Sequence, residues 1–207
     1  MSDCYYAYDI QSSKSILFIP PIDPEDVIWS GLPVTIDDAL KLYDVDEVRL
    51  TTEVNATLAE LAAANPKSTV FALDGQVSDH IKLDAFEKKD LKSLKRAIET
   101  ARIVKDEYEV ALIRKANKIS GEAHAAVVKR GKNAKNEQEL EAAFLERCVS
   151  HGAKEMAYHP ILASGTGAAT LHYVDNAQPL DGKLNVLVDA GAEWKNYASD
   201  IVRLPSR

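Results

Sequence analysis

Hydrophobic and polar residues repeat with two different periods along this chain. In the first third, strand-type alternation at residues 5–10 and 15–19 is followed by a proline cluster at residues 20–24, which should end the second strand. The further elements expected here are helices over residues 35–43 and 55–64 and strands over residues 47–50 and 69–73. This succession of strands and helices predicts a small α/β domain.

The middle of the chain has the spacing of a long amphipathic helix. Asp106 and Glu109 form a capping-box pattern, and the helix that follows should end at Gly131. One face of this helix is expected to carry Val110, Ile113, Asn117, Ser120, His124 and Val127. His124 has no second histidine at a metal-ligand spacing, so by itself it is interpreted as a surface or capping residue.

A second helix is predicted to begin at Asn136 and to end at Gly152. Its Leu140, Phe144 and Cys148 recur at every fourth position, which indicates a buried face. Strands and a turn should follow: strands over residues 161–163, 171–174, 184–189 and 197–202, and the turn over residues 164–167.

A charged segment over residues 85–104 is interpreted as a linker helix between two domains. The first domain is a partial amino-terminal α/β domain over residues 1–84, and the second covers residues 105–207. The fold class expected for the whole chain is therefore α/β, with α+β character in the second domain.

Composition narrows the functional classes. The 46% hydrophobic and 28% charged residues indicate a globular protein, and no apolar run approaches the roughly 20 residues of a membrane span. The net charge is −7 and the basic residues are interleaved with acidic ones, which argues against a nucleic-acid partner. Two distant cysteines, Cys4 and Cys148, and the lack of a signal-peptide pattern predict a cytoplasmic protein.

The candidate chemistry lies in the last quarter of the chain. Asp189 ends an apolar run, Asp200 follows eleven positions later, and Gly191 provides a turn residue between them. Adjacent strands could therefore bring both carboxylates to one edge of a sheet. Carboxylates are hard oxygen ligands that suit Mg²⁺, Mn²⁺ or Ca²⁺. Aspartate is also common at strand ends, so a purely structural role stays open at this point.

Several segments resemble one family. Residues 187–201 read Leu-Val-Asp-Ala-Gly-Ala-Glu-Trp-Lys-Asn-Tyr-Ala-Ser-Asp-Ile, and Ala-Ala-Thr-Leu-His-Tyr precedes them at residues 168–173. Together with residues 102–117 and 27–31, they resemble the fungal-type Xaa-Pro aminopeptidases and prolidases, which are pita-bread metallopeptidases. The resemblance covers essentially the whole chain.

The resemblance implies both a fold and a function. Residues 105–207 would form the first half of a pita-bread catalytic domain. The activity would be the release of an amino-terminal residue that precedes proline, with a peptide carrying proline in its second position as substrate. Asp189 would chelate one of two divalent ions, usually manganese, Asp200 would bridge both, and His172 would lie near the scissile bond. Homodimerisation of a complete member is left open.

The end of the chain departs from the family pattern. The family completes its metal site with a later histidine and two glutamates, whereas residues 201–207 contain no His, Asp or Glu. The first predicted strand also begins almost at Met1. We therefore expect a chain truncated at both ends and inactive alone. Two alternatives are a non-catalytic, pita-bread-derived interaction protein and a simple α/β metal binder unrelated to peptidases.

Overall fold

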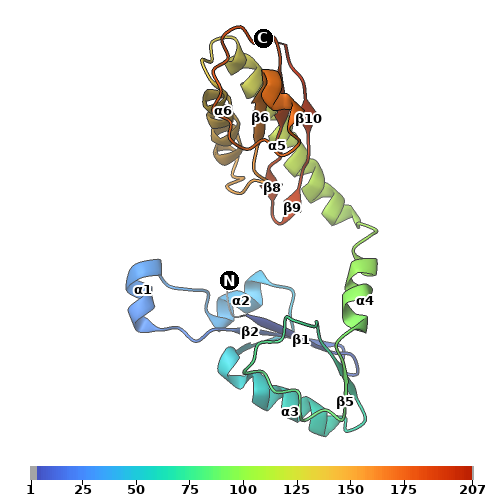
Figure 1. Ribbon diagram of the computed structural model, residues 1–207. Coiled ribbons are helices and arrows are strands. Elements are labelled where there is room, and N and C mark those ends of the chain that lie inside the picture. Colours follow the sequence, from blue (N-terminus) through green and yellow to red (C-terminus); the bar gives the residue numbers. More distant parts are fainter. Residues whose placement is uncertain (1–3, 207) are drawn as a thin grey trace. The chain divides into compact units, whose positions relative to one another are not determined.

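The structure, a computed structural model, describes residues 4–206 and divides into two compact units, Met1–Ile103 and Val104–Arg207. Unit 1 contains a three-stranded sheet in the order β1-β2-β3 (Figure 1). Strands β1 (Tyr5–Asp9) and β2 (Lys14–Ile19) form an antiparallel hairpin, and β3 (Glu47–Leu50) runs parallel to β2. The alternating residues of the first segment thus form the predicted strands.

The other elements of unit 1 surround or extend this sheet. They are α1 (Pro24–Ser30), α2 (Ile36–Leu42), the short 3-10 helix η1 (Thr51–Glu53), α3 (Val54–Ala64), β4 (Thr69–Phe71), β5 (Lys88–Asp90) and α4 (Ser93–Ala101). Residues of α3, including Val54 and Leu58, pack against Ile16 and Phe18 of β2. Burial of this apolar face, rather than intrinsic propensity, is the main source of stability for so short a helix.

The segment at residues 85–104 is not one linker helix. Its first part, β5, pairs in parallel with β4, with Thr69 opposite Lys88, and only its second part forms helix α4.

Helix α1 was not expected from the sequence. Asp23 caps it by accepting a hydrogen bond from the Glu25 N–H, and Pro24 fits the first helical turn, where no backbone donor is needed.

Unit 2 combines two helices with a sheet. The helices are α5 (Glu107–Gly131) and α6 (Glu137–Ser150), and a short 3-10 helix η2 (Gly165–Ala169) follows later. An antiparallel sheet in the order β10-β7-β6 is built from β6 (Ile161–Ser164), β7 (Val186–Asp189) and β10 (Val202–Arg203). Strands β8 (Glu193–Trp194) and β9 (Tyr197–Ala198) form a separate hairpin.

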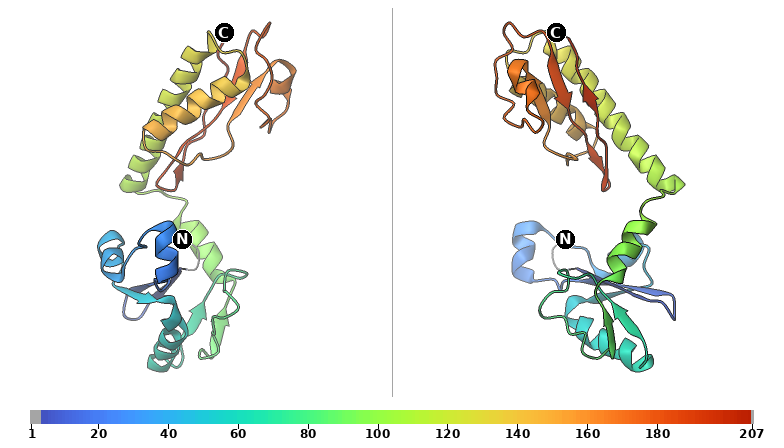
Figure 2. Two further views of the ribbon diagram at one scale, coloured as in Figure 1. Left: turned by 90° about the vertical axis from the view of Figure 1, so that its left-hand side faces the viewer. Right: turned by 45° about the vertical axis from the view of Figure 1, so that its right-hand side comes forward.

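Helices α5 and α6 pack side by side and against the sheet (Figure 2). The predicted capping box is present, because Asp106 and Glu109 each accept a hydrogen bond from the other's backbone N–H. Phe144 and Cys148 are completely buried in the core, as the helical spacing indicated. Asn117 is different: it lies on the exposed side of α5 and donates to the Ile113 carbonyl. Within residues 4–206, no helix is both long and apolar enough to cross a bilayer.

One strand prediction in unit 2 was wrong, and another was wrong in part. Residues 171–174 form a turn and loop, in which the Leu171 side chain is 88% exposed. The run over residues 197–202 is split into β9, which pairs with β8, and β10, which pairs with β7. Alternation of apolar and polar residues was too short in both places to decide the structure.

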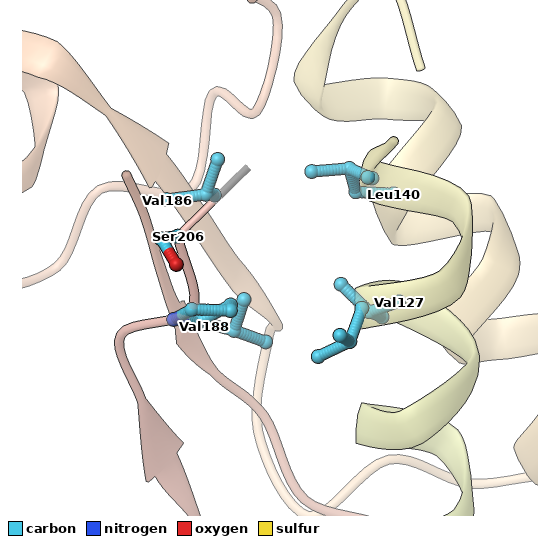
Figure 3. A pocket seen from close by; sticks show the side chains of 8 residues that line it. Val127, Leu140, Val186, Val188 and Ser206 are labelled. Carbon is cyan, nitrogen blue, oxygen red and sulfur yellow. The ribbon is translucent and has the colours of Figure 1, made fainter. Parts of the chain in front are cut away.

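A small cavity lies between the helices and the sheet of unit 2 (Figure 3). Val127 of α5 and Leu140 of α6 face Val186 and Val188 of β7 across it. Its volume is about 20 Å³, and its lining is mostly apolar. A space of this size and character is a packing defect and not a ligand pocket, since ligand pockets are at least ten times larger, about 300 Å³ or more.

Candidate functional site

The candidate site is formed where three strands of unit 2 meet. Asp189 is the last residue of the central strand β7 and lies opposite Ile161 of β6 on one side and Val202 of β10 on the other. Because both neighbours are antiparallel to β7, the end of β7 meets the beginnings of β6 and β10. The segments that enter β6 and β10 therefore reach the same edge, and they carry Tyr158 and Asp200.

One tyrosine contacts both carboxylates. The Tyr158 hydroxyl lies 2.6 Å from Asp189 Oδ1 and 3.1 Å from Asp200 Oδ1. A hydroxyl has a single proton, so it donates to one carboxylate at a time, and the shorter distance favours Asp189. The two Oδ1 atoms are separated by no more than the sum of these distances. The spacing of the two aspartates predicted that they would meet, and the structure brings them together.

The environment of Tyr158 keeps its hydroxyl protonated. Burial raises the pKa of Tyr158 well above its usual range, and the bonds to Asp189 and Asp200 raise it further, because a phenolate beside two carboxylates would be repelled. The tyrosine therefore acts as a permanent hydrogen-bond donor to the pair at physiological pH.

This pKa gives a prediction at high pH. In the unfolded chain Tyr158 ionises near its ordinary value of about 10, whereas in the folded chain it stays protonated. Its contribution to stability should be complete below pH 10 and should be lost as the pH rises toward the folded value. Unfolding titrations of the wild type and of Tyr158→Phe should therefore differ in slope above pH 10. Parallel curves would contradict the assigned contacts.

The charge balance of the site suits a cation. Asp189 is half-buried and Asp200 is exposed, and within residues 4–206 neither forms an ion pair with Lys, Arg or His. One neutral hydroxyl is shared between two negative charges, so a positive ion beside them would be stabilised. The donors are carboxylate oxygens, which divalent ions such as Mg²⁺ and Mn²⁺ prefer. The residues present thus fit a divalent metal, although no three His, Cys, Asp or Glu side chains cluster in the described part of the chain.

The backbone around Gly191 fixes the relative position of these segments. The Ala157 N–H donates to the Gly191 carbonyl at 2.9 Å, which ties the Tyr158 segment to the end of β7. On the other side, a Cβ atom on Gly191 would lie 1.7 Å from the Ser199 carbonyl oxygen. Only glycine allows the chain before Asp200 to approach this closely.

The β8–β9 hairpin returns the chain from Asp189 to Asp200. Lys195 and Asn196 make its two-residue turn and both have positive φ, 49° and 66°, as in a type I′ turn. The Tyr197 hydroxyl donates to Glu109 Oε1 at 2.7 Å, and this bond lowers the pKa of Glu109. The hairpin is thereby joined to the first turn of α5, and Asp200 follows it at a fixed place.

His172 lies on a different segment from the two carboxylates. It is exposed in the turn after η2, and no hydrogen bond or ion pair joins it to Asp189 or Asp200 in the described residues. Its neighbour Tyr173 donates to Glu137 Oε2 at 2.8 Å. The structure therefore fixes the loop beside His172 without placing the imidazole in the carboxylate pair.

Comparison with known proteins agrees with this arrangement. The profile of metallopeptidase family M24 matches residues 111–204, and that of the aminopeptidase P N-terminal domain matches residues 1–71. A probable Xaa-Pro aminopeptidase of Fusarium vanettenii is 68% identical over 98% of this chain. The chain belongs to the Xaa-Pro aminopeptidase family of M24 metallopeptidases.

Solved structures of this family share the fold. The low-pH form of Escherichia coli aminopeptidase P matches 93% of the chain with a TM-score of 0.81 and 28% identity. A zinc-substituted form of the E. coli enzyme in complex with product matches 96% of it with a TM-score of 0.80 and 28% identity. The expected architecture, an amino-terminal α/β domain followed by part of a pita-bread domain, is confirmed. The chain spans 44% of the Fusarium protein, and 47% and 48% of the two E. coli chains.

Sequence reasoning missed two features of the site. Tyr158 had no signal of its own, because a tyrosine in a loop before a strand is unremarkable until the strands pair. His124 was interpreted as a surface or capping residue, but it is buried and contacts the Ala190 carbonyl at 2.9 Å. Its place on the buried face of α5, next to Ser120 in the helical repeat, was the signal that could have found it.

Proposed function

We propose that this protein is a metal-dependent aminopeptidase that releases the amino-terminal residue from peptides with proline in the second position. The observation that carries the proposal is the Asp189 and Asp200 pair, which shares one Tyr158 hydroxyl and has no basic partner within residues 4–206, in a chain of the Xaa-Pro aminopeptidase family. That a solved E. coli aminopeptidase P with the same fold is zinc-substituted supports a metal-dependent activity.

In this proposal Asp189 and Asp200 hold divalent cations, two of them in a complete site, with Mn²⁺ as the expected metal. Such ions, when bound, lower the pKa of a water and polarise the carbonyl that precedes proline. The protein's own contribution is to fix the two carboxylates. The Tyr158 hydroxyl lies within hydrogen-bond distance of the Oδ1 atoms of both and donates to one of them at a time.

His172 is proposed to act on the substrate side. Its imidazole is exposed, so a peptide can reach it, and the adjacent Tyr173 is fixed by Glu137. A neutral imidazole can donate one hydrogen bond to a peptide carbonyl near the scissile bond. This role orients the peptide and does not require His172 to contact the carboxylates.

Hydrolysis of an Xaa-Pro dipeptide by the purified chain with added Mn²⁺ tests the proposal. Three proteins are compared: the wild type, Asp200→Ala, and Asp181→Ala, which removes an exposed carboxylate of unit 2 outside the site. The sequence predicts that the chain alone is inactive, whereas a working metal site in this chain predicts turnover in the wild type and in Asp181→Ala. In that case Asp200→Ala should lose at least about 100-fold, since an ion that loses a ligand is held poorly.

The outcomes separate two functions. Selective loss in Asp200→Ala supports a peptidase. Equal background rates in all three proteins, each shown to be folded by circular dichroism, would reject catalysis by this chain alone. That result is expected both for an incomplete metal site and for the non-catalytic interaction protein.

A further inference from the structure

Two buried polar residues of α5 contact the segments that carry the paired carboxylates. Ser120 and His124 are four positions apart, so they lie one above the other on the same face of the helix. Helix α5 packs against β8 and β9 (Figure 1), and His124 contacts Ala190, the residue after β7. We call Ser120 and His124 the α5 polar pair.

Ser120 joins the two arms of the hairpin in a closed set of hydrogen bonds. The Ala192 N–H donates to Ser120 Oγ at 2.8 Å, and Ser199 Oγ donates to the Ala192 carbonyl at 3.0 Å. Ser120 Oγ and Ser199 Oγ are 2.6 Å apart. Because the single Ser199 proton goes to Ala192, Ser120 must be the donor between the two hydroxyls. Each donor and acceptor in this buried set is therefore satisfied.

His124 contacts the same region from one turn further along α5. Its Nε2 lies 2.9 Å from the Ala190 carbonyl oxygen, which can only accept, so Nε2 carries the proton. The ring packs edge-on against Phe144, with centroids 5.5 Å apart. Burial lowers the pKa of His124, which favours the neutral ring with one fixed donor.

Both polar residues contact a residue directly beside a candidate ligand. Ala190 directly follows Asp189, and Ser199 directly precedes Asp200. Between them, Gly191 lies against the Ser199 carbonyl with no room for a side chain. One rigid helix therefore determines the backbone position of both aspartates at once.

We propose that Ser120 and His124 are positioning residues that set the separation of the Asp189 and Asp200 carboxylates for a divalent cation. The proposal rests on the metal site in the proposed function. Other buried positions of the same helix, Ala116, Ile119 and Ala123, carry only apolar side chains. Ser120 instead bonds to Ser199, directly before Asp200, and His124 bonds to Ala190, directly after Asp189.

Cation binding can be measured without peptidase activity. The probe is Tb³⁺, a hard cation that binds carboxylates and whose luminescence is sensitised by a nearby tyrosine such as Tyr158, with Mn²⁺ as competitor. Ser120→Ala is expected to weaken binding about tenfold, the usual effect of losing a residue that orients a metal ligand. Ser150→Ala, which removes an exposed hydroxyl from α6, should leave affinity unchanged.

Two further comparisons separate positioning from stability. Ser199→Ala should weaken cation binding as much as Ser120→Ala does. The double variant should lose little more affinity than either single variant, because the two hydroxyls act as one set. His124→Gln, which keeps an N–H donor near the Nε2 position, should bind more tightly than His124→Leu. All titrations are made well below each variant's melting temperature, so only folded protein is compared.

The results distinguish the inference from the proposed function. If the wild type binds Tb³⁺ and Asp200→Ala does not, the metal site stands, and unchanged affinity in the folded Ser120, Ser199 and His124 variants would overturn the positioning role alone. If wild-type binding does not depend on Asp200, both the metal site and this inference fail. Should Ser120→Ala not fold, the His124→Gln and His124→Leu comparison decides the question.

Discussion

Replacement of Gly191 by alanine is expected to unfold unit 2 or to destabilise it by at least about 3 kcal/mol, the upper part of the range for overpacking. The added Cβ would lie 1.7 Å from the Ser199 carbonyl oxygen and 3.3 Å from the Asp200 N atom. Both are backbone atoms, so no side-chain rotation can relieve the clash. The segment before Asp200 would have to move away from the end of β7, and the contact of both aspartates with Tyr158 would be lost.

Gly121→Ala is the matched control for this substitution. Gly121 is exposed on α5, and a Cβ atom added there would have no neighbouring side chain within 4 Å. Alanine favours a helix over glycine, so this variant should be about 1 kcal/mol more stable than the wild type. Urea unfolding followed by Trp194 fluorescence, in a background with the exposed Trp29 changed to phenylalanine, reports on unit 2. Equal stability of Gly191→Ala and the wild type would contradict the close approach.

Loss of the Glu137 carboxylate should have the second large effect. Glu137 is completely buried at the start of α6 and accepts four hydrogen bonds. Ser164 gives two of these, through its N–H and its hydroxyl, both at 2.7 Å, and the Tyr173 hydroxyl and the Gln178 N–H give the others at 2.8 and 2.9 Å. The carboxylate thus joins β6, the His172 loop and the segment after it.

Glu137→Leu is expected to destabilise unit 2 by about 4 kcal/mol. Hydrogen bonds to a charged group contribute about 1.5–3 kcal/mol each, and removal of a buried charge offsets part of their loss. Glu137→Gln keeps one acceptor oxygen but turns an NH₂ donor toward other donors, so a loss of about 2 kcal/mol is expected. Urea unfolding measures both values.

Hydrogen exchange identifies where Glu137 acts. The amides of Ser164 and Gln178 should lose protection in Glu137→Leu, because each donates to the carboxylate in the wild type. Glu146→Leu changes an exposed glutamate on the same helix and should alter stability by no more than about 0.5 kcal/mol. A similar loss of stability in the two leucine variants would show that the buried contacts of Glu137 contribute little.

Local signals in the sequence determined the long helices. The cap of α5 depends on Asp106 and Glu109, three residues apart, and the buried side of α6 depends on a four-residue repeat of apolar side chains. Both involve neighbours on one helix, so the order of residues is sufficient to predict them. The incorrect strand at residues 171–174 shows the limit, since Tyr173 is held by Glu137, 36 positions away.

In the candidate site, too, some features follow from the sequence and others only from the tertiary structure. The sequence alone indicated that Asp189 ends an apolar strand and that adjacent strands around Gly191 could bring Asp200 beside it, because turn chemistry and strand period are local properties. It placed Asp200 within a strand over residues 197–202, whereas Asp200 lies between β9 and β10. Only the tertiary structure decided that Tyr158 joins the two carboxylates and that Ser120 and His124 fix their backbone. These contacts connect residues 31 to 79 positions apart. They exist only after strand register and helix packing have brought the segments together, and no local pattern records that register.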